Sequence, residues 1–340
     1  MSQVTMKDVA RLAKVSPRTV SNVVNDYTHV SDDVRRRVLA AIDELGYRPN
    51  LVARNLRTGR TGLLALIVPE IDVPYFSELA RAVIDAASAH GYRVMIDQTG
   101  HDHERERQLL IGSDRTMLFD GILFSPLVTQ DEIADLDSNA VLPTILLGEH
   151  TFTGRFDHIA IDNTRAAHEA TTHLAATGRR RIAAVGAQPR ETYRTPRQRT
   201  AGYLRALADA GLPRDDDLVV PAVRYHRRDG YDAARRLLAL DAPPDAIFCY
   251  SDLLAMGAMR AVQDAGRRIP EDVAIIGIDD IEEGRFAIPS LSTVALDKDV
   301  IATRALEQLV RRIEDPSRPA TQTVVPHTLI QRDSTRPAGR

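Results

Sequence analysis

From residue 63 onward, short apolar runs alternate with longer amphipathic stretches, and this alternation restricts the fold more than any other feature of the sequence. Apolar runs of this kind are typical of buried parallel strands. The amphipathic stretches between them are typical of the helices that connect such strands. The sequence therefore predicts an α/β core. The expected strands are residues 63–68, 93–97, 121–125, 144–147, 182–185, 246–249 and 273–278, with a last strand-like stretch at 323–330.

The length of 340 residues exceeds one typical core, so we expect a small module joined to a two-lobed body. Apolar runs such as 63–68 fall far short of the roughly 20 residues that a membrane helix needs. Lys7 and Asp8 stand where a secretory signal would be apolar, so a cytoplasmic protein is expected. The single cysteine, Cys249, lies in an apolar run and is expected to be a buried, inert thiol rather than a nucleophile.

The charge of the chain is unevenly distributed. The net charge of −3 alone argues against a nucleic-acid-binding protein. Residues 1–60, however, hold 11 Lys or Arg against 6 Asp or Glu, so they carry +5 and the remaining 280 residues carry −8. A basic head on an acidic body suits an anionic polymer at one end, although an excess of this size also arises by chance.

The first 46 residues predict three short helices, each beginning after a residue that favours the N-cap position. These N-cap residues are Thr5, Ser16 and Ser31. Asp8 completes a capping-box pair in the first helix, Pro17 occupies the first position of the second, and Gly46 ends the third. Helices this short must pack on one another to bury their apolar faces. Residues 1–49 are therefore predicted to form an all-α headpiece.

The second of these helices has a polar face without an acidic residue. Its apolar residues Val20, Val23 and Val24 are expected to face inward. Arg pairs with guanine and Asn with adenine in the major groove, while hydroxyl groups suit phosphates. On an isolated helix such a face is usually only solvated, but its position after a tight turn favours a helix-turn-helix. The face consists of Pro17, Arg18, Ser21, Asn22 and Asn25.

Three segments of this region, residues 4–10, 15–25 and 45–50, resemble the headpiece of the lac repressor (LacI/GalR) family. The resemblance extends over nearly the whole chain and implies a sequence-specific transcription regulator that binds a pseudo-palindromic DNA operator. Many family members have Arg where this chain has Asn22. The residues that the resemblance assigns to DNA binding are Thr5, Ser16, Pro17, Arg18, Thr19, Ser21, Asn22, Asn25, His29, Ser31, Asn50, Ala53 and Leu56.

Residues 50–60 join the headpiece to the core and are too short to form a stable helix alone. The resemblance implies that two such hinge helices, one per subunit, pair in the minor groove, with Leu56 wedged between base pairs and Ala53 allowing close approach. The alternative is a plain linker. Tetrameric relatives carry a C-terminal leucine heptad helix that this sequence lacks, so we expect a homodimer.

Within the core, polar residues accumulate at the predicted carboxyl ends of strands, where open parallel sheets bind ligands. The resemblance implies the two-lobed fold of periplasmic sugar-binding proteins. Its N-lobe comprises about 61–162 and 293–322, and its C-lobe about 163–291 and 323–333. The polar residues 334–340 are expected to form a disordered tail. The chain then crosses between lobes near Asp162, near 291–294 and near Val324.

The resemblance also implies an effector site in which Asp162, Arg199 and Asp279 hold hydroxyl groups. Carboxylates, a guanidinium and aromatic rings suit a sugar, which has polar edges and apolar faces; no cofactor or metal is implied. As alternatives, the aspartates could cap helices, Arg199 could be structural, and Tyr225 could lie at the surface. Ser251 replaces the usual Asn of the family, and Leu296 replaces a polar residue of some sugar-responsive members. The assigned effector residues are Asp72, Phe76, Ser125, Asp162, Arg199, Tyr225, Ser251 and Asp279.

Other features of the sequence indicate neither a metal site nor an enzyme. His101 and His103 lie in a loop-like stretch where neighbouring side chains diverge, so a solvated loop is expected rather than a metal site. No phosphate-binding glycine motif occurs. The aspartates at strand ends could serve an acid-base enzyme, but that alternative leaves the headpiece unexplained. The sequence thus predicts a repressor controlled by a small molecule.

Overall fold

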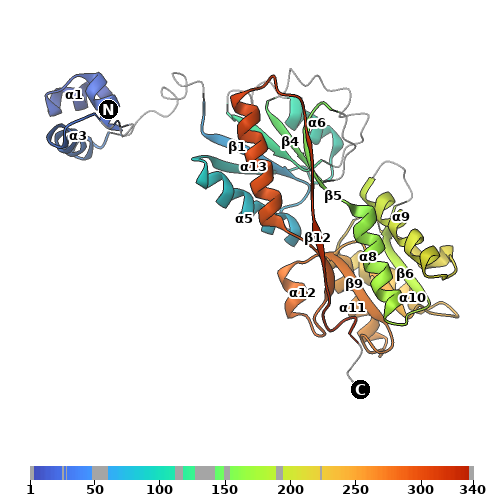
Figure 1. Cartoon of the computed structure of the whole chain (residues 1–340). Helices are drawn as coiled ribbons and strands as arrows, with labels where there is room; N and C mark the ends of the chain where they lie inside the picture. The colour runs from blue at the N-terminus through green and yellow to red at the C-terminus, as the bar shows by residue number, and fades with distance from the viewer. Residues whose placement is uncertain are drawn as a thin grey trace. The chain divides into compact units, whose positions relative to one another are not determined.

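The computed structural model describes residues 4–24, 27, 29–47, 60–111, 118–126, 142–148, 154–188, 194–222 and 224–336. The chain divides into two compact units, Met1–Thr61 and Gly62–Arg340 (Figure 1). The predicted hinge helix lies outside the described residues. So do four of the predicted DNA-binding residues, Asn25, Asn50, Ala53 and Leu56.

The first unit contains the three predicted helices, α1 (Met6–Ala13), α2 (Pro17–Val24) and α3 (Asp32–Leu45). Thr5 donates from its backbone nitrogen and from Oγ1 to Oδ2 of Asp8, at 3.0 and 2.6 Å, which confirms the capping pair. Gly46 ends α3 with a φ of 62°, a conformation that glycine adopts without strain. The small core of this unit is built from Val9, Ala10, Ala13, Val20, Val23, Val38, Ala41 and Tyr47.

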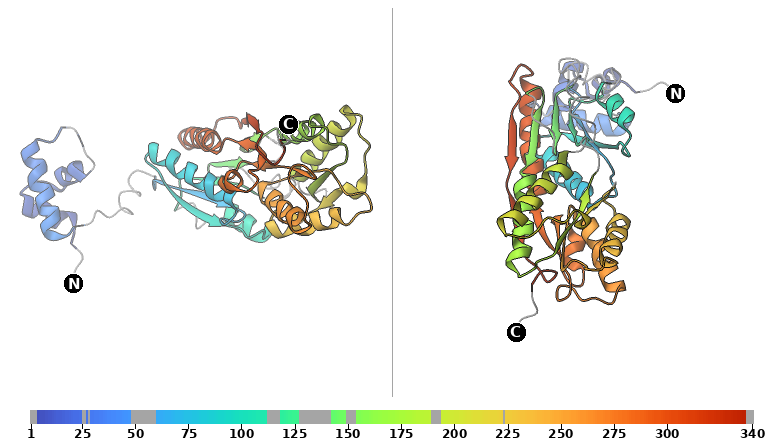
Figure 2. Two further views of the ribbon diagram at one scale, coloured as in Figure 1. Left: turned by 90° about the horizontal axis from the view of Figure 1, so that it is seen from below. Right: turned by 90° about the vertical axis from the view of Figure 1, so that its right-hand side faces the viewer.

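The second unit holds two six-stranded sheets, one in each of two lobes, which confirms the predicted α/β fold. The first lobe's sheet has the order β11-β5-β4-β3-β1-β2 and all its strands are parallel. Its strands are β1 (Leu63–Val68), β2 (Arg93–Gln98), β3 (Gly121–Phe124), β4 (Thr144–Leu147), β5 (Asp157–Ile161) and β11 (Gln322–Val325). Its helices are α5 (Pro74–Ala89), α6 (His103–Ile111) and α13 (Lys298–Glu314). The two views in Figure 2 show α13 on the outer surface of this lobe.

The second lobe's sheet has the order β12-β10-β9-β8-β6-β7, with only the β10 and β12 pair antiparallel. Its strands are β6 (Ile182–Ala187), β7 (Val219–Pro221), β8 (Ala246–Cys249), β9 (Ala274–Asp279), β10 (Ser292–Leu296) and β12 (His327–Ile330). Its helices are α8 (Asn163–Ala176), α9 (Arg194–Asp209), the short 3-10 helix η2 (Asp216–Leu218), α10 (Arg227–Leu238), α11 (Asp252–Asp264) and α12 (Glu282–Phe286).

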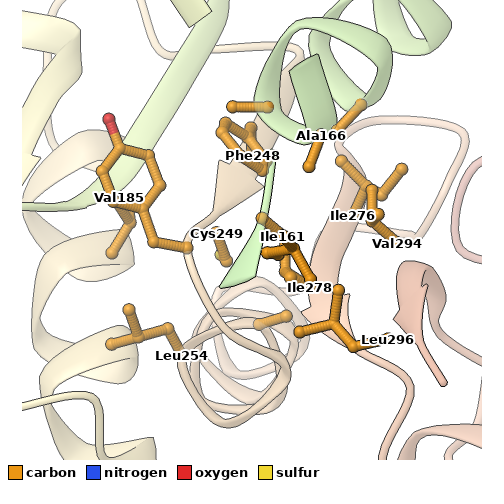
Figure 3. Close-up of a cluster of buried hydrophobic side chains, with 14 of the residues drawn as sticks. Ile161, Ala166, Val185, Phe248, Cys249, Leu254, Ile276, Ile278, Val294 and Leu296 are labelled. Atoms are coloured by element: carbon orange, nitrogen blue, oxygen red, sulfur yellow. The ribbon is translucent and has the colours of Figure 1, made fainter. Parts of the chain in front are cut away.

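The second lobe's core lies between its sheet and the helices on both sides of it. Figure 3 shows Phe248, Ile276 and Val294 from neighbouring strands together with Ala166 of α8 and Leu254 of α11. Each of these side chains is fully buried. Cys249 is also fully buried, and burial raises the pKa of its thiol, as expected for an inert residue.

Three strands escaped the sequence pattern: β5, β7 and β10. Strand β5 is entirely buried but begins with Asp157 and His158, so its sequence is not an apolar run. Arg312 of α13 donates to Asp157 Oδ2 at 2.9 Å and thereby compensates the buried carboxylate. Conversely, residues 93–97 were predicted to be a buried strand, whereas β2 is a half-exposed edge strand with a neighbour on one side only.

The crossings between lobes differ from those predicted. Strand β10 pairs with β9 in the second sheet, so the chain returns to the first lobe only after Leu296. Pro326, which has no backbone N–H, separates β11 in the first sheet from β12 in the second. The crossings predicted near 291–294 and Val324 therefore fall a few residues early, while the crossing at Asp162, between β5 and α8, lies as predicted.

The predicted disordered tail begins too early. Ser334 and Thr335 are fully buried. Ser334 Oγ donates to the carbonyl oxygen of Ile275 at 2.6 Å and accepts from the backbone nitrogen of Ser292 at 2.8 Å. The Thr335 hydroxyl lies 2.7 Å from Ser292 Oγ and 2.8 Å from His173 Nε2. These polar residues order the chain because their hydroxyl groups bind buried polar atoms of the second lobe.

Candidate functional site

The polar face predicted for α2 lies on the outside of the headpiece. Val20 and Val23 are buried, whereas Pro17 and Arg18 are exposed and Asn22 is half-buried. A short helix that presents a guanidinium and an amide in this way has the donors and acceptors that read base edges in the major groove.

The N-terminus of α2 carries two hydroxyl groups. Ser16 Oγ accepts a hydrogen bond from the backbone nitrogen of Thr19 at 3.1 Å and lies 2.9 Å from Thr19 Oγ1. Hydroxyl groups at a helix N-terminus suit a phosphate. Three other predicted contacts are exposed: Thr5 at the cap of α1, and His29 and Ser31 before α3. Ser21 of α2 is half-buried.

In the second lobe, Arg199 of α9 is buried and joins two chain segments. Its Nε donates to Oδ1 of Asn163 at 2.7 Å, and its Nη1 donates to the carbonyl oxygen of Tyr250, directly after β8. Asn163 Nδ2 is buried and has no hydrogen-bond partner among the residues that the structure describes. A buried donor of this kind needs an acceptor oxygen from a ligand or a water. Asn163 was not among the predicted site residues.

Tyr225 is half-buried beside the same strand ends. Its hydroxyl donates to the carbonyl oxygen of Gly186 at 2.7 Å, at the end of β6. Gly186 has a φ of 122°, and a Cβ there would lie 2.6 Å from that of Tyr250. This crowding permits only glycine and brings Tyr225 close to the segment that Arg199 holds.

Three other predicted residues of this lobe have different roles. Asp162 is exposed, and its Oδ1 accepts from the backbone nitrogen of Arg165 at 2.9 Å, so it caps α8. Ser251 Oγ likewise accepts from the backbone nitrogen of Leu254 at 3.3 Å and caps α11. Asp279 is half-buried at the end of β9 with a φ of 123°, a strained conformation for a residue other than glycine.

The strained turn after β9 is supported by Asp252, which sequence reasoning did not select. Thr293 Oγ1 donates to Asp252 Oδ1 at 2.7 Å, and the backbone nitrogen of Ile281 donates to Oδ2 at 3.0 Å. Burial raises the pKa of Asp252 well above its ordinary value, and the nearby charge of Asp279 raises it further.

In the first lobe, Phe76 is half-buried on α5, with its ring edge-on to Tyr75 at a centroid distance of 5.1 Å. Ser125 is half-buried directly after β3, and Asp72 is exposed in the loop before α5. Among the described residues, Lys298 makes a contact between the lobes that was not predicted. Lys298, the first residue of α13, donates from Nζ to the carbonyl oxygens of Asp279 and Asp280 at 2.6 and 3.2 Å.

Comparison with known proteins agrees with this arrangement. Residues 5–50 match the family model "Bacterial regulatory proteins, lacI family", and residues 171–335 match "Periplasmic binding protein-like domain". The HTH-type transcriptional regulator RegA of Clostridium saccharobutylicum is 31% identical over 97% of this chain and 99% of its own length. The HTH-type transcriptional repressor PurR of Mannheimia succiniciproducens is 32% identical over 91% of this chain and 92% of its own. A structure of the regulator CelR with cellobiose is 30% identical, with a TM-score of 0.72 over 98% of this chain and all of that one.

A helix-turn-helix headpiece joined to a two-lobed binding core defines a DNA-binding transcription regulator that responds to a small molecule. The chain belongs to the LacI family of bacterial transcription regulators. The resemblance inferred from the sequence is therefore confirmed, and the alternative of an acid-base enzyme is excluded, because regulators of this family are not enzymes. In the described part of the chain, no helix combines the length and apolarity needed to span a membrane.

Proposed function

We propose that this protein is a repressor whose affinity for its operator is set by a sugar bound between the lobes of the core. The observation that carries the sugar assignment is the buried pair of Arg199 and Asn163, in which the Nδ2 donor of Asn163 has no partner among the described residues. The solved complex of the relative CelR with cellobiose supports the sugar, and the name of the relative PurR supports the repressor.

The chemistry at the strand ends suits a polyol. Arg199 and Asn163 supply donors, Asp279 supplies an acceptor, and the half-buried rings of Tyr225 and Phe76 offer apolar faces. A sugar presents hydroxyl groups at its edges and C–H groups on its faces, so it satisfies both kinds of group at once. Asp72, Ser125, Asp162 and Ser251 complete the proposed set, with Asp162 and Ser251 acting through the helices that they cap.

On the DNA side, α2 enters the major groove, where Arg18 and Asn22 contact base edges and Ser16 and Thr19 hold phosphates. The exposed positions of Pro17 and Arg18 and the paired hydroxyl groups of Ser16 and Thr19 support this assignment. The hinge contacts of Ala53 and Leu56 in the minor groove follow from the family resemblance. A regulator of this kind acts in the cytoplasm, where the chromosome lies.

The acting form is a homodimer on a pseudo-palindromic operator. Phe286 of α12 is 78% exposed and Ile288 beside it is 87% exposed. Large apolar side chains this exposed and this close together are typical of a surface that a partner covers. A second copy of the chain places a second headpiece on the DNA, as a two-fold operator requires.

Selection from random DNA duplexes by the full chain tests this function. A palindromic motif should be enriched. Affinity for it should fall by roughly a thousandfold or more between low and moderate salt if on the order of 6 to 10 phosphates are contacted; this is the general size of the effect for DNA-binding proteins, the lac repressor among them. Thermal-shift measurements with cellobiose and other sugars test the effector, since a ligand of the folded state raises its apparent stability. A flat salt titration or the absence of a palindrome contradicts DNA recognition; stabilisation by non-sugar metabolites alone contradicts the sugar assignment.

A further inference from the structure

Glu70 connects the two lobes through contacts that none of the proposed DNA or effector roles requires. It follows β1 in the first lobe, and its side chain is mostly buried. His226, which precedes α10 in the second lobe, lies with Nε2 2.5 Å from Glu70 Oε2. Arg224 of the second lobe approaches Glu70 Oε1 to 3.8 Å, and His101 of the first lobe approaches the same atom to 3.2 Å.

The electrostatics of this cluster keep the Glu70 carboxylate charged. Burial raises the pKa of Glu70, but the hydrogen bond with His226 and the charges of His101, His226 and Arg224 outweigh burial, so the pKa lies below its ordinary value. A carboxylate that is mostly shielded from water depends on these partners, and the hydrogen bond to His226 comes from the other lobe.

The sheet order shows why the position of this contact matters. All three crossings lie at or next to one edge of each sheet, at β5, β11, β10 and β12. Glu70 follows β1, four strands from β11, and His226 lies after β7, four strands from β10. With strands about 4.8 Å apart, the contact lies on the order of 19 Å from the crossings. Lobes that hinge about the crossings must separate Glu70 from His226.

A second contact between the lobes, made by Lys298, lies close to the crossings and is not expected to break when the lobes hinge. Lys298 and Glu78 form an ion pair at 2.9 Å, and Glu78 Oε1 accepts from the backbone nitrogen of Glu282 at 2.9 Å. Lys298 begins α13, two residues after the last residue of β10, so its contacts move little when the lobes hinge. Opening and closing therefore depend mainly on the far edge of the sheets.

We propose that Glu70, His226 and Arg224 form a clasp that holds the two lobes closed, with the hydrogen bond between Glu70 and His226 as the element that breaks on opening; His101 contacts Glu70 from within the first lobe and does not link the lobes. The clasp sets the fraction of molecules that are closed before any effector binds. If the closed state is the one that binds effector, the apparent affinity for effector rises in proportion to the fraction of molecules that are closed. This inference concerns the core alone and holds whatever the effector is.

The test is a distance measurement across the lobes of the full chain by pulsed electron paramagnetic resonance. Ser88→Cys and Ala239→Cys place spin labels on exposed positions of the first and second lobes. The native Cys249 is fully buried, so it does not react with the label. The variants added to this labelled chain are Glu70→Gln and His226→Asn, which break the contact between the lobes, and His101→Asn as the matched control.

His101→Asn is a sharp control because it removes an imidazole from the same carboxylate without removing a contact between lobes. His101 has a φ of 64°, a conformation that Asn tolerates well. We expect the ratio of open to closed molecules to rise about tenfold in both Glu70→Gln and His226→Asn, equivalent to about 1.4 kcal/mol, and to stay near the parent value in His101→Asn. Far-ultraviolet circular dichroism confirms that each variant is folded.

Two results overturn the proposal. One is a distance distribution in Glu70→Gln and His226→Asn that matches the parent chain. The other is opening of His101→Asn to the same extent as His226→Asn, which would mean that the cluster only stabilises the first lobe. Operator binding measured on the same proteins separates this outcome from failure of the proposed function, because no clasp residue is among the proposed DNA contacts.

Discussion

Arg199 Nε donates a 2.7 Å hydrogen bond to Asn163 Oδ1 and thereby connects α9 to the first residue of α8. The same guanidinium donates to the carbonyl oxygen of Tyr250 after β8. The residue expected to bind the effector is therefore also a structural link between three segments of the second lobe. This double role decides how the effector site can be tested without unfolding the protein.

Arg199→Lys keeps the buried charge but loses the planar fork that contacts Asn163 and Tyr250. We expect the affinity for a sugar identified by the thermal screen to fall about tenfold or more for each lost charge-assisted hydrogen bond. Asp279→Asn should weaken effector binding in the same way, whereas operator affinity without effector stays near the parent value. Isothermal calorimetry and operator titration measure the two quantities.

Arg165→Ala provides the matched control, because Arg165 is an exposed arginine of α8 that pairs with Glu169 at 2.7 Å. Its effector affinity should equal that of the parent chain. If Arg199→Lys or Asp279→Asn responds normally to the effector, the residue in question does not belong to the site.

Arg18→Ala should cost about 1 to 3 kcal/mol of operator binding and relax base preference at one base pair in each half-site. The reason is that an exposed arginine on the recognition face forks onto a guanine, while the buried Val20 and Val23 keep α2 in place. Binding to a library of single-base operator variants measures the effect. Arg11→Ala on α1, whose side chain pairs with Asp8, is the control and should leave base preference intact. Unchanged preference in Arg18→Ala would show that α2 is not the reading helix.

Asp252 makes stability depend on pH. Its pKa is higher in the folded protein than in the unfolded chain, so the folded state retains the proton to higher pH. The protonated carboxyl group contributes fully to the free energy of unfolding below the pKa of Asp252 in the unfolded chain, which is about 3.9. This contribution is lost as the pH rises through the pKa of Asp252 in the folded protein, at up to about 1.4 kcal/mol per pH unit. Asp252→Asn removes this loss. We expect the Tm of the parent to fall relative to that of Asp252→Asn as the pH rises above the unfolded pKa, and a constant difference in Tm would refute it.

Gly257 of α11 lies against the backbone of α10. A Cβ at Gly257 would overlap the carbonyl oxygen of Arg227, and a Cβ at Gly230 of α10 would overlap the carbonyl oxygen of Leu254. Gly257→Ala should therefore lower the free energy of unfolding by about 1 to 3 kcal/mol, because the two helices must separate. Gly284→Ala is the control, since a Cβ there meets its nearest neighbour at 3.4 Å, an ordinary contact. Chemical denaturation gives both values; equal stability of the two variants would contradict the close helix packing.

Local patterns in the sequence were sufficient for the headpiece and for most of the strands. Each of these signals involves residues within a few positions of one another, so local chain geometry specifies them. Examples are the helix caps at Thr5 and Gly46 and the helical spacing of the apolar residues Val20 and Val23. The apolar runs of β1, β8 and β9 are equally local signals, because a strand buried on both faces needs apolar residues throughout. The outward position of the polar face of α2 followed from the same local periodicity.

Only the tertiary structure decided which sheet receives each strand and which polar residues meet. Asp157 is acceptable in a buried strand because Arg312, 155 residues away, supplies its partner. The buried donor of Asn163 and the contact of Glu70 with His226, 156 residues away, likewise depend on the packing of distant segments. Burial makes polar contacts strong by excluding water, and burial is a property of the folded molecule, so no local pattern in the sequence reveals which distant residue will serve as the partner.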